Sequence, residues 1–393
     1  MLRTGIGNGS TGPLARRLPP GMIARFDFAG SVTDLVMGNP FSAVLPAVNG
    51  KYYDRFGVPC IAGPDQPRLN GLGAVTEGES TNKCTCVKYN PQSVAGLTQT
   101  AGAAVLSVVD DSAELIGSGF GLFAGNAYKL DNTSGGIDSV VTCSGITNNV
   151  NPHSLSVVVK GVGSLTTNSY VAPIAFNNPT YERVENEGII PTGGGNTLVV
   201  RTAAGEITYF ILPQSEESLR CSSTIVGDNT AAPATRATDA ASAGVDGNGY
   251  KFNLSNNPAL AASFASKGSL QAMFQPRFTF ADGLTDLGLW TVNDTVEGPL
   301  YIGSDSKLTM SDGTNTVALD YAYSFEEQLD VRPWWGGNSM GLKLYDALGN
   351  LLEENGGAFA GSWPSVGYLK PHFGNEAACV YNSLSGFDNL EAA

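Results

Sequence analysis

Residues 207–242, which read ITYFILPQSEESLRCSSTIVGDNTAAPATRATDAAS, decide how the chain is divided. Residues 207–212 form a compact apolar run rich in β-branched and aromatic side chains, a pattern typical of a buried strand. Pro213 has no N–H group to give to a sheet, so we expect the strand to end there. Residues 219–248 are small, polar and proline-containing, which indicates a linker between two domains.

The composition indicates a fold made of strands. The chain has 393 residues, enough for two or three domains with cores of their own. It holds 49 Gly and 21 Pro but only 15% charged residues, whereas helix bundles carry many charged straight-chain residues. Short strand-like runs, separated by Gly and Asn turns, recur on both sides of the linker. We therefore predict an all-β protein with two antiparallel jelly-roll β-sandwiches in tandem, residues 84–218 and 249–393.

The N-terminal segment differs from the rest of the chain. Residues 26–83 are irregular and too short for a full domain, so we expect a small attachment unit packed either on the part of the chain that follows or on a neighbouring subunit. Residues 1–25 contain four arginines and no acidic residue. They are either an unstructured terminus or a basic arm that orders against an acidic partner surface. The four residues expected to mediate such attachment are Arg3, Arg16, Arg17 and Arg25.

The net charge of −14 argues against a general nucleic-acid binder, which needs clustered Lys and Arg to neutralise phosphates. No run of the sequence has the length and apolar character of a membrane-spanning helix, and the N-terminus lacks the apolar core of a secretory signal. We expect no nucleic-acid partner and no membrane insertion.

Cysteine and histidine give no metal-binding pattern. The six cysteines are scattered through a long chain, which favours reduced thiols over a disulfide framework. The spacing of Cys84 and Cys86 is not that of a zinc knuckle, and His153 and His372 have no ligand spacing around them. Asp131, Asn132 and Asp138 could hold calcium through oxygen atoms, but turns of this composition are far commoner without an ion. We expect no metal and no cofactor.

Three glutamates are the only candidates for acid–base chemistry. Glycoside hydrolases place two carboxylates across the scissile bond, and Glu182, Glu185 and Glu187 form a cluster that we assign to a solvated loop. Glu216 follows the end of a predicted strand and is expected at the surface. His153 begins an alternating strand, and no Gly-x-Ser-x-Gly motif accompanies either histidine. We predict that the chain has no catalytic residues and is not an enzyme.

Tryptophans offer the clearest candidates for ligand contact. Residues 332–338, RPWWGGN, place Trp334 and Trp335 beside a glycine turn, and Trp363 lies in a second predicted loop. Neighbouring residues of a strand face opposite sides, so we expect one of the adjacent pair in the core and the other exposed or in an interface. An exposed indole face can stack on a sugar ring. The three tryptophans are therefore either core or subunit-interface residues or glycan contacts.

The order of elements resembles that of tailed-bacteriophage fibre, spike and appendage proteins with tandem concanavalin-A-like (laminin-G-like) jelly rolls. The resemblance touches most of the chain through short pieces taken in order. These are KYYDRFGV at 51–58, Pro67-Arg68, Glu79-Ser80-Thr81-Asn82, KLDNTSGG at 129–136, HSLSVVVKG at 153–161, YFILPQSEES at 209–218 with TRATDAAS at 235–242, and Gly386-Phe387-Asp388-Asn389-Leu390.

The resemblance implies a non-enzymatic structural protein at the virion surface, assembled in the host cytoplasm. It implies other virion proteins of the capsid, portal or tail as partners, a homotrimeric assembly, and adhesion to a host-surface glycan. Two alternatives stay open, namely a soluble lectin-like adhesin and, with less support, a glycan-degrading enzyme on the same fold.

Overall fold

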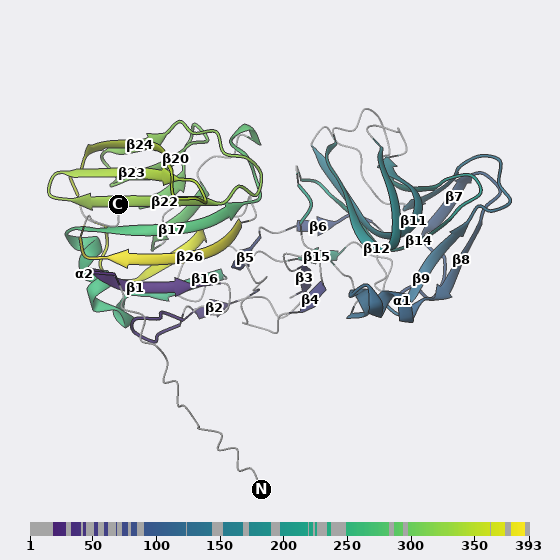
Figure 1. The fold of residues 1–393 in the computed structure, drawn as a ribbon, viewed down its shortest axis with the longest axis horizontal. Helices are drawn as coiled ribbons and strands as arrows, with labels where there is room; N and C mark the ends of the chain where they lie inside the picture. Colours follow the sequence, from purple (N-terminus) through teal and green to yellow (C-terminus); the bar gives the residue numbers. More distant parts are fainter. Residues whose placement is uncertain are drawn as a thin grey trace, which may run out of the picture.

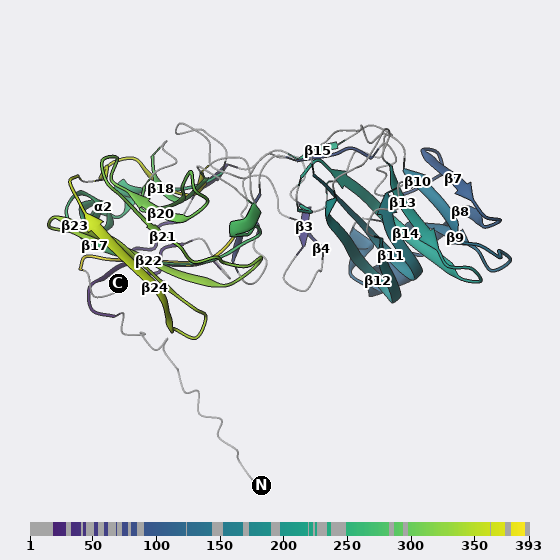
Figure 2. The same ribbon diagram turned by 90° about the horizontal axis from the view of Figure 1, so that it is seen from above.

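The computed structural model describes residues 19–28, 33–40, 42–44, 51–53, 59–61, 68, 73–77, 80–84, 90–122, 124–143, 152–167, 173–189, 197–218, 220–222, 225, 234–236, 249–282, 287–293, 298–361, 363–373 and 379–389. These residues form an all-β protein, as predicted, with antiparallel sheets in two lobes that lie side by side in Figures 1 and 2. Among the described residues, no helix is long and apolar enough to cross a membrane.

Lobe one is a strongly curved sheet of eight described strands in the order β7-β10-β13-β11-β14-β9-β8, with β12 paired to β11. The strands are β7 (Leu97–Ala101), β8 (Val105–Asp110), β9 (Asn126–Asp131), β10 (Ser139–Cys143), β11 (His153–Thr167), β12 (Ile174–Ile189), β13 (Leu198–Thr202) and β14 (Ile207–Glu216). The sheet closes around a core drawn from most of them, including Tyr128, Val157, Val200 and Phe210. Helix α1 (Ser112–Gly117) and the 3-10 turn η1 (Phe120–Leu122) pack beside it.

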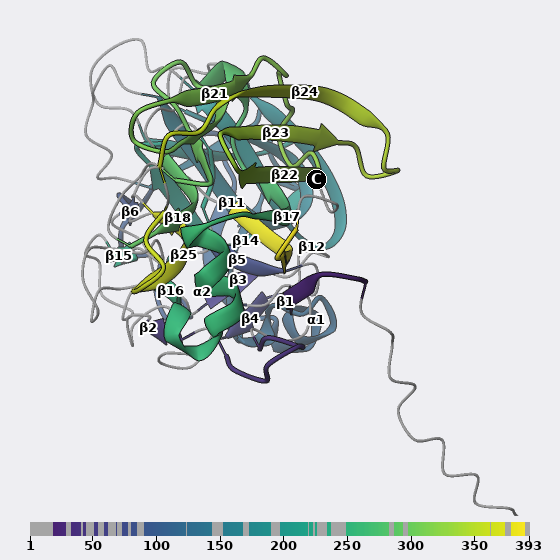
Figure 3. The ribbon, with the colours of Figure 1, turned by 90° about the vertical axis from the view of Figure 1, so that its left-hand side faces the viewer.

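Lobe two is a sandwich of two sheets, seen edge-on in Figure 3. The first, here the front sheet, contains β1 (Met22–Asp27), β26 (Cys379–Phe387), β17 (Gly268–Pro276), β22 (Leu329–Gly336), β23 (Ser339–Tyr345) and β24 (Leu351–Ala358) in that order, with β5 (Ala74–Thr76) paired to β26. The second contains β2 (Ser42–Val44), β16 (Gly249–Asn253), β25 (Tyr368–Phe373), β18 (Leu287–Val292), β19 (Leu300–Ile302), β20 (Leu308–Ser311) and β21 (Thr316–Leu319).

Helix α2 (Pro258–Ala265) closes one end of lobe two. Asn257 caps it, because its side chain accepts a hydrogen bond from the backbone N–H of Leu260, and Pro258 fits the first turn. Leu260 and Phe264 are fully buried in the core between the sheets. A 3-10 turn, η2 (Leu254–Asn256), precedes α2, and another, η3 (Phe280–Asp282), follows β17.

The N-terminal segment differs from the predicted separate unit at 26–83. Strand β1 pairs with β26, β5 pairs with β26 and β2 pairs with β16, so this segment completes both sheets of lobe two. The reason lies in the alternation of β1, which buries Ala24 and Phe26 in the core. Lobe one, residues 97–216, is therefore inserted between two parts of lobe two, and the predicted tandem boundaries are corrected accordingly.

The connection between the lobes is made of short paired strands. Strand β6 (Ser80–Asn82) pairs with β15 (Ala234–Arg236), which lies inside the predicted linker at 219–248. A second pair joins β3 (Lys51–Tyr53) and β4 (Pro59–Ile61). Both pairs lie between the lobes in Figure 1. Two segments far apart in sequence thus run together at the junction.

The predicted strand end at Pro213 is wrong, and a second long strand also passes through an irregular residue. Strand β14 continues past Pro213 to Glu216, because a bulge opposite Ser156–Val158 absorbs Leu212, with its positive φ of 51°, and the proline that cannot donate. Strand β11 likewise continues past Gly161, whose positive φ of 118° marks a second irregular residue inside a strand. In both places an irregular residue bends a strand that stays paired on either side.

Candidate functional site

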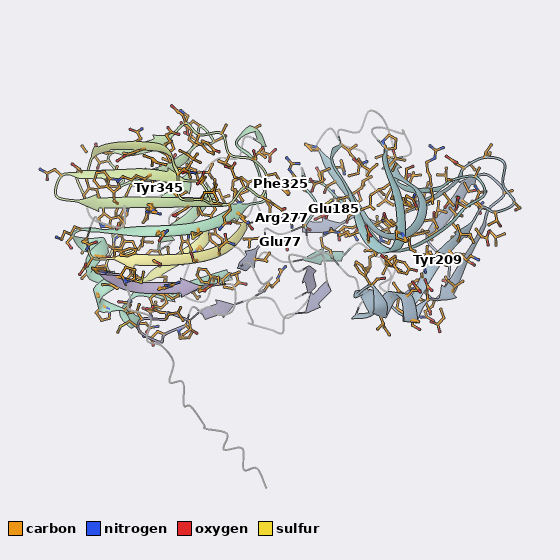
Figure 4. All side chains as sticks on the ribbon, in the orientation of Figure 1. Glu77, Glu185, Tyr209, Arg277, Phe325 and Tyr345 are labelled. Carbon is orange, nitrogen blue, oxygen red and sulfur yellow. The ribbon has the colours of Figure 1, made fainter. Side chains whose placement is uncertain are left out.

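The outer face of the front sheet carries the strongest candidate site. Asp330, Arg332 and Trp334 occupy alternate positions of β22 and share this face, while Val331 and Trp335 point into the core. Strand β23 contributes Gly341, Lys343 and Tyr345 opposite them, through the pairs Trp334–Gly341, Arg332–Lys343 and Asp330–Tyr345. Tyr345 marks this face in Figure 4. The alternation of one strand and the register of its neighbour together assemble the site.

Trp334 is half-buried and lies flat against glycine. A Cβ atom at Gly341 would come within 2.7 Å of indole atoms Cε2 and Cζ2, and one at Gly356 of β24 within 3.6 Å of Cζ2. The six-membered ring therefore rests on the backbone of two neighbouring strands. Such close approach requires residues without side chains beneath the ring. The side chain as a whole is only partly covered.

Polar groups beside the indole are linked in a fixed series. Arg332 donates to both carboxylate oxygens of Asp330, from Nε at 3.2 Å and from Nη2 at 2.8 Å. Gln271 of β17 donates from Nε2 to Oδ2 of Asp330 at 2.8 Å, and the Arg332 guanidinium lies 4.1 Å from the centre of the Tyr345 ring. This series crosses three strands. Because each group holds the next, the polar atoms are oriented before any ligand arrives.

Trp335 and Trp363 lie in the core of lobe two. Their exposed fractions are 0% and 6%, and their rings meet edge to face with centroids 4.8 Å apart. The indole N–H of Trp335 donates to the Ser263 carbonyl at 2.8 Å, and that of Trp363 to the Ser311 carbonyl at 2.9 Å. Neither ring has a free face on which a sugar could stack. The glycan expectation is corrected at these two positions and retained only for Trp334.

The three candidate carboxylates lie on strand β12, not on the predicted loop. Glu182 and Glu185 stand at odd separation along the strand and face opposite sides, while Glu185 and Glu187 share one side. Arg183 pairs with Glu185 at 2.7 Å, and Arg220 with Glu187 at 3.2 Å. Each of the two carboxylates on the shared side is therefore held in place by an arginine side chain.

A buried thiol completes this cluster. Glu185, Glu187 and Cys221 bring their potential ligand atoms within 4.8 Å of one another. However, the Cys221 backbone N–H donates to Glu187 at 2.7 Å, its Sγ donates to the Leu155 carbonyl at 3.3 Å, and burial raises the pKa of the thiol well above its ordinary value. A protonated thiol is a poor metal ligand. The arrangement stabilises the strand end and does not favour a metal ion.

Glu216 is fully buried, although the sequence predicted it at the surface. Its carboxylate accepts hydrogen bonds from the Ser222 N–H at 3.0 Å and from Gln214 Nε2 at 2.6 Å. The bulge in β14 carries the strand on to this position, which explains why the prediction failed. These bonds fasten the start of the predicted linker to lobe one.

The possible calcium turn is occupied by protein partners. Asp131 accepts from the Thr133 hydroxyl at 2.7 Å, and this bond, together with Lys129, lowers the pKa of Asp131 to about 2. Asn132 is fully buried and donates to the carbonyls of Ile137 and Ala203, while Asp138 pairs with Arg201 at 3.5 Å. The oxygens that would bind calcium thus already have protein donors.

The remaining candidates are distributed as follows. Of the four arginines expected in an N-terminal arm, Arg25 lies within β1, paired with Ser385, and Arg3, Arg16 and Arg17 fall outside the described residues. His153 is buried at the start of β11, where burial lowers its pKa from 6.5, as expected of a structural residue. The side chain of His372 lies outside the described residues. Four cysteines whose side chains the structure describes, Cys84, Cys143, Cys221 and Cys379, are free thiols.

The polar residues of the site were missed by sequence reasoning. Asp330, Arg332 and Trp334 alternate in the stretch DVRPWW, so period-two alternation would have placed all three on one face. The glycine floor and Tyr345 could not be found in the same way, because they depend on the pairing register between strands.

No protein-family model and no curated protein matches the chain.

Proposed function

We propose that this chain is a non-enzymatic structural protein of a tailed-bacteriophage virion, a head or tail fibre, spike or decoration protein. In this proposal it stands at the virion surface and presents its sandwiches for adhesion to a host-surface glycan. The observation that carries the adhesive part is the half-buried Trp334 on its glycine floor beside the Asp330–Arg332 pair. The ordered series of sequence pieces supports the virion part.

Attachment would use the residues before the first strand. Arg3, Arg16 and Arg17 lie in a stretch without acidic residues, and a basic segment suits an acidic surface of a capsid, portal or tail protein. Arg25 is not included in the proposed attachment arm, because its backbone is part of the front sheet. The proposed arm therefore ends before Pro19. A homotrimer is the proposed assembly, in keeping with the resemblance to fibres and spikes.

The virion proposal is tested by gold-labelled antibody against residues 249–393, imaged on intact phage particles by electron microscopy. Gold at the tail tip supports an adhesin and gold over the head supports a capsid fibre or decoration. Particles without gold, with the antigen shown to be accessible, contradict the virion proposal. Variants with Arg3, Arg16 and Arg17 changed to Ser should lose incorporation into particles while both lobes keep their thermal transitions.

The alternative of a soluble lectin-like adhesin uses the same Trp334 face without a virion. It is favoured if the purified chain binds cells unchanged after residues 1–18 are removed and no particle carries it. A glycan-degrading enzyme is the weaker alternative, suggested by the proximity of Glu185 and Glu187. If Glu187→Gln abolished release of sugar from a polysaccharide that the unaltered chain degrades, the non-enzymatic proposal would be wrong.

A further inference from the structure

The charge around Trp334 restricts the kind of ligand that this face can hold. Arg332 is paired with Asp330 at 2.8 Å, and Lys343 with Glu354 of β24 at 3.8 Å. Each cation of the site thus has a carboxylate partner, and the local charge is balanced. The chain as a whole carries −14 charges, which repel an anionic ligand at long range. An acidic sugar would gain no local attraction to offset that repulsion.

The shape of the face suits a flat, partly apolar ring. Trp334 has Gly341 as its partner on β23 and Ser269 as its partner on β17, so small residues flank the indole on both sides along the sheet. A pyranose has an apolar face of C–H groups that packs on an aromatic ring. No large side chain of these two neighbouring positions stands in the way of such stacking.

Beside the ring, the polar series can order hydroxyl groups. Arg332 and Asp330 occupy the next two positions on the same face of β22, about 7 Å and about 13 Å along the strand from Trp334, which suits contacts to successive units of an oligosaccharide. Carboxylate and guanidinium groups bond pairs of adjacent hydroxyls, the former as acceptor and the latter as donor. Their mutual bonds and the bond from Gln271 fix their orientation in advance, which reduces the entropy lost on binding.

From these observations we infer that the Trp334 face binds an uncharged pyranose residue of a polysaccharide. Trp334 stacks on the apolar face of this sugar, and the Asp330–Arg332 pair holds hydroxyls of the adjoining part of the polysaccharide. The inference rests on the proposed adhesive function and names its ligand class, a neutral sugar in preference to a uronic or sialic acid.

The chain provides its own probe for this binding. It has four tryptophans, and the other three, Trp290, Trp335 and Trp363, are buried. A change in indole fluorescence on adding ligand therefore reports mainly on Trp334. We would titrate the full chain with neutral oligosaccharides built from glucose, galactose, mannose or N-acetylglucosamine, and with oligosaccharides of uronic and sialic acids. Saturable quenching or blue shift is expected with at least one neutral sugar and not with the acidic ones.

Matched variants test whether the sugar binds on Trp334 and the glycine beneath it. Trp334→Ala should weaken binding by about tenfold or more, and Trp334→Phe should lose less, since a smaller aromatic face remains. Gly341→Ala should weaken binding because its methyl group displaces the indole. Leu348→Ala, at the exposed hairpin tip between β23 and β24, is the surface control. Circular dichroism melting verifies that each variant is folded.

The possible results distinguish a failure of the neutral-sugar inference from a failure of the proposed function. Saturable binding of acidic sugars alone overturns the neutral class and leaves glycan adhesion standing. If a neutral sugar still binds to both Trp334→Ala and Gly341→Ala, the Trp334 face is not the binding site. Absence of any sugar binding overturns the inference and the adhesive function together, while the gold-labelling experiment still decides the virion role.

Discussion

At the scale of single residues, the three tryptophans show how much of a side chain's burial can be predicted from the local sequence alone. Alternation correctly predicts that Trp334 and Trp335 separate into surface and core. Which of them is buried depends on the register of β22 against its neighbours, and that register follows from contacts distant in sequence. Trp363 stands in a proline-flanked loop, yet packs beneath Trp335 because its N–H reaches the Ser311 carbonyl.

His153 gives lobe one a pH-dependent stability. Burial, the main cause, lowers the pKa of the folded imidazole from 6.5, with a smaller opposing effect of Glu217. The unfolded chain therefore takes up a proton first as the pH falls, and the folded lobe loses stability below about pH 6.5. We expect the melting temperature of lobe one to fall between pH 7 and pH 5, and to fall less in His153→Gln.

The control for this pH effect is the second histidine. His372→Gln should leave the slope of melting temperature against pH unchanged for lobe one, measured by scanning calorimetry. Asp131, with its pKa of about 2, titrates below this window and does not interfere. Equal slopes in the unaltered chain and in His153→Gln would contradict the assignment.

At the scale of elements, glycine and proline inside strands account for most of the wrong boundaries. The apolar run at 207–212 correctly predicts a buried strand, since side-chain pattern is local information. Gly161 has a φ of +118° within β11 and lets the strand bend around the core. Pro213 is accommodated by a bulge. Sequence marks such irregular residues but not whether pairing resumes beyond them.

The bend at Gly161 should be intolerant of any side chain. A Cβ atom there would lie 2.2 Å from the Ile207 carbonyl oxygen, and the backbone conformation is strained for other residues. We expect Gly161→Ala to lower the unfolding free energy of lobe one by about 2–4 kcal/mol. Gly136→Ala, where nothing lies within 4 Å, should change it by about 0.5 kcal/mol or less. Urea titration followed by circular dichroism compares the two.

Strand β1 should be essential to lobe two, in contrast to the residues before it. It contributes Ala24 and Phe26 to the core, followed by Phe28, which is 2% exposed. Deleting residues 1–28 should remove about 5 kcal/mol or more of stabilisation and abolish the lobe-two transition in calorimetry. Deleting residues 1–18 should leave that transition unchanged. If both deletions melt alike, the segment is not an integral strand.

At the scale of the whole molecule, the two lobes meet through a cluster of charged and aromatic side chains. Arg220, held to lobe one by Glu187, pairs with Asp282 of lobe two at 3.4 Å and lies 5.0 Å from the centre of the Phe325 ring. Arg277 lies 5.8 Å from the same ring and 3.9 Å from Glu77. Phe325, Arg277, Glu77 and Glu185 gather between the lobes in Figure 4. Sequence could not reveal this contact, because its members are far apart along the chain.

Loss of Arg220 should therefore loosen the lobes without unfolding them. Arg220→Ala removes one ion pair and one cation–π contact across the junction, while the paired strands β6 and β15 still tether it. We expect a larger maximum dimension in small-angle X-ray scattering and more widely separated calorimetric transitions for the two lobes. High salt should change the scattering and the calorimetric transitions of the unaltered chain in the same direction, since it screens the partly exposed pair.

The control variant is Lys307→Ala. It removes the same charge from a surface pair with Asp320 and should have no such effect. Scattering curves that coincide for all three proteins would show that Arg220 does not hold the lobes together.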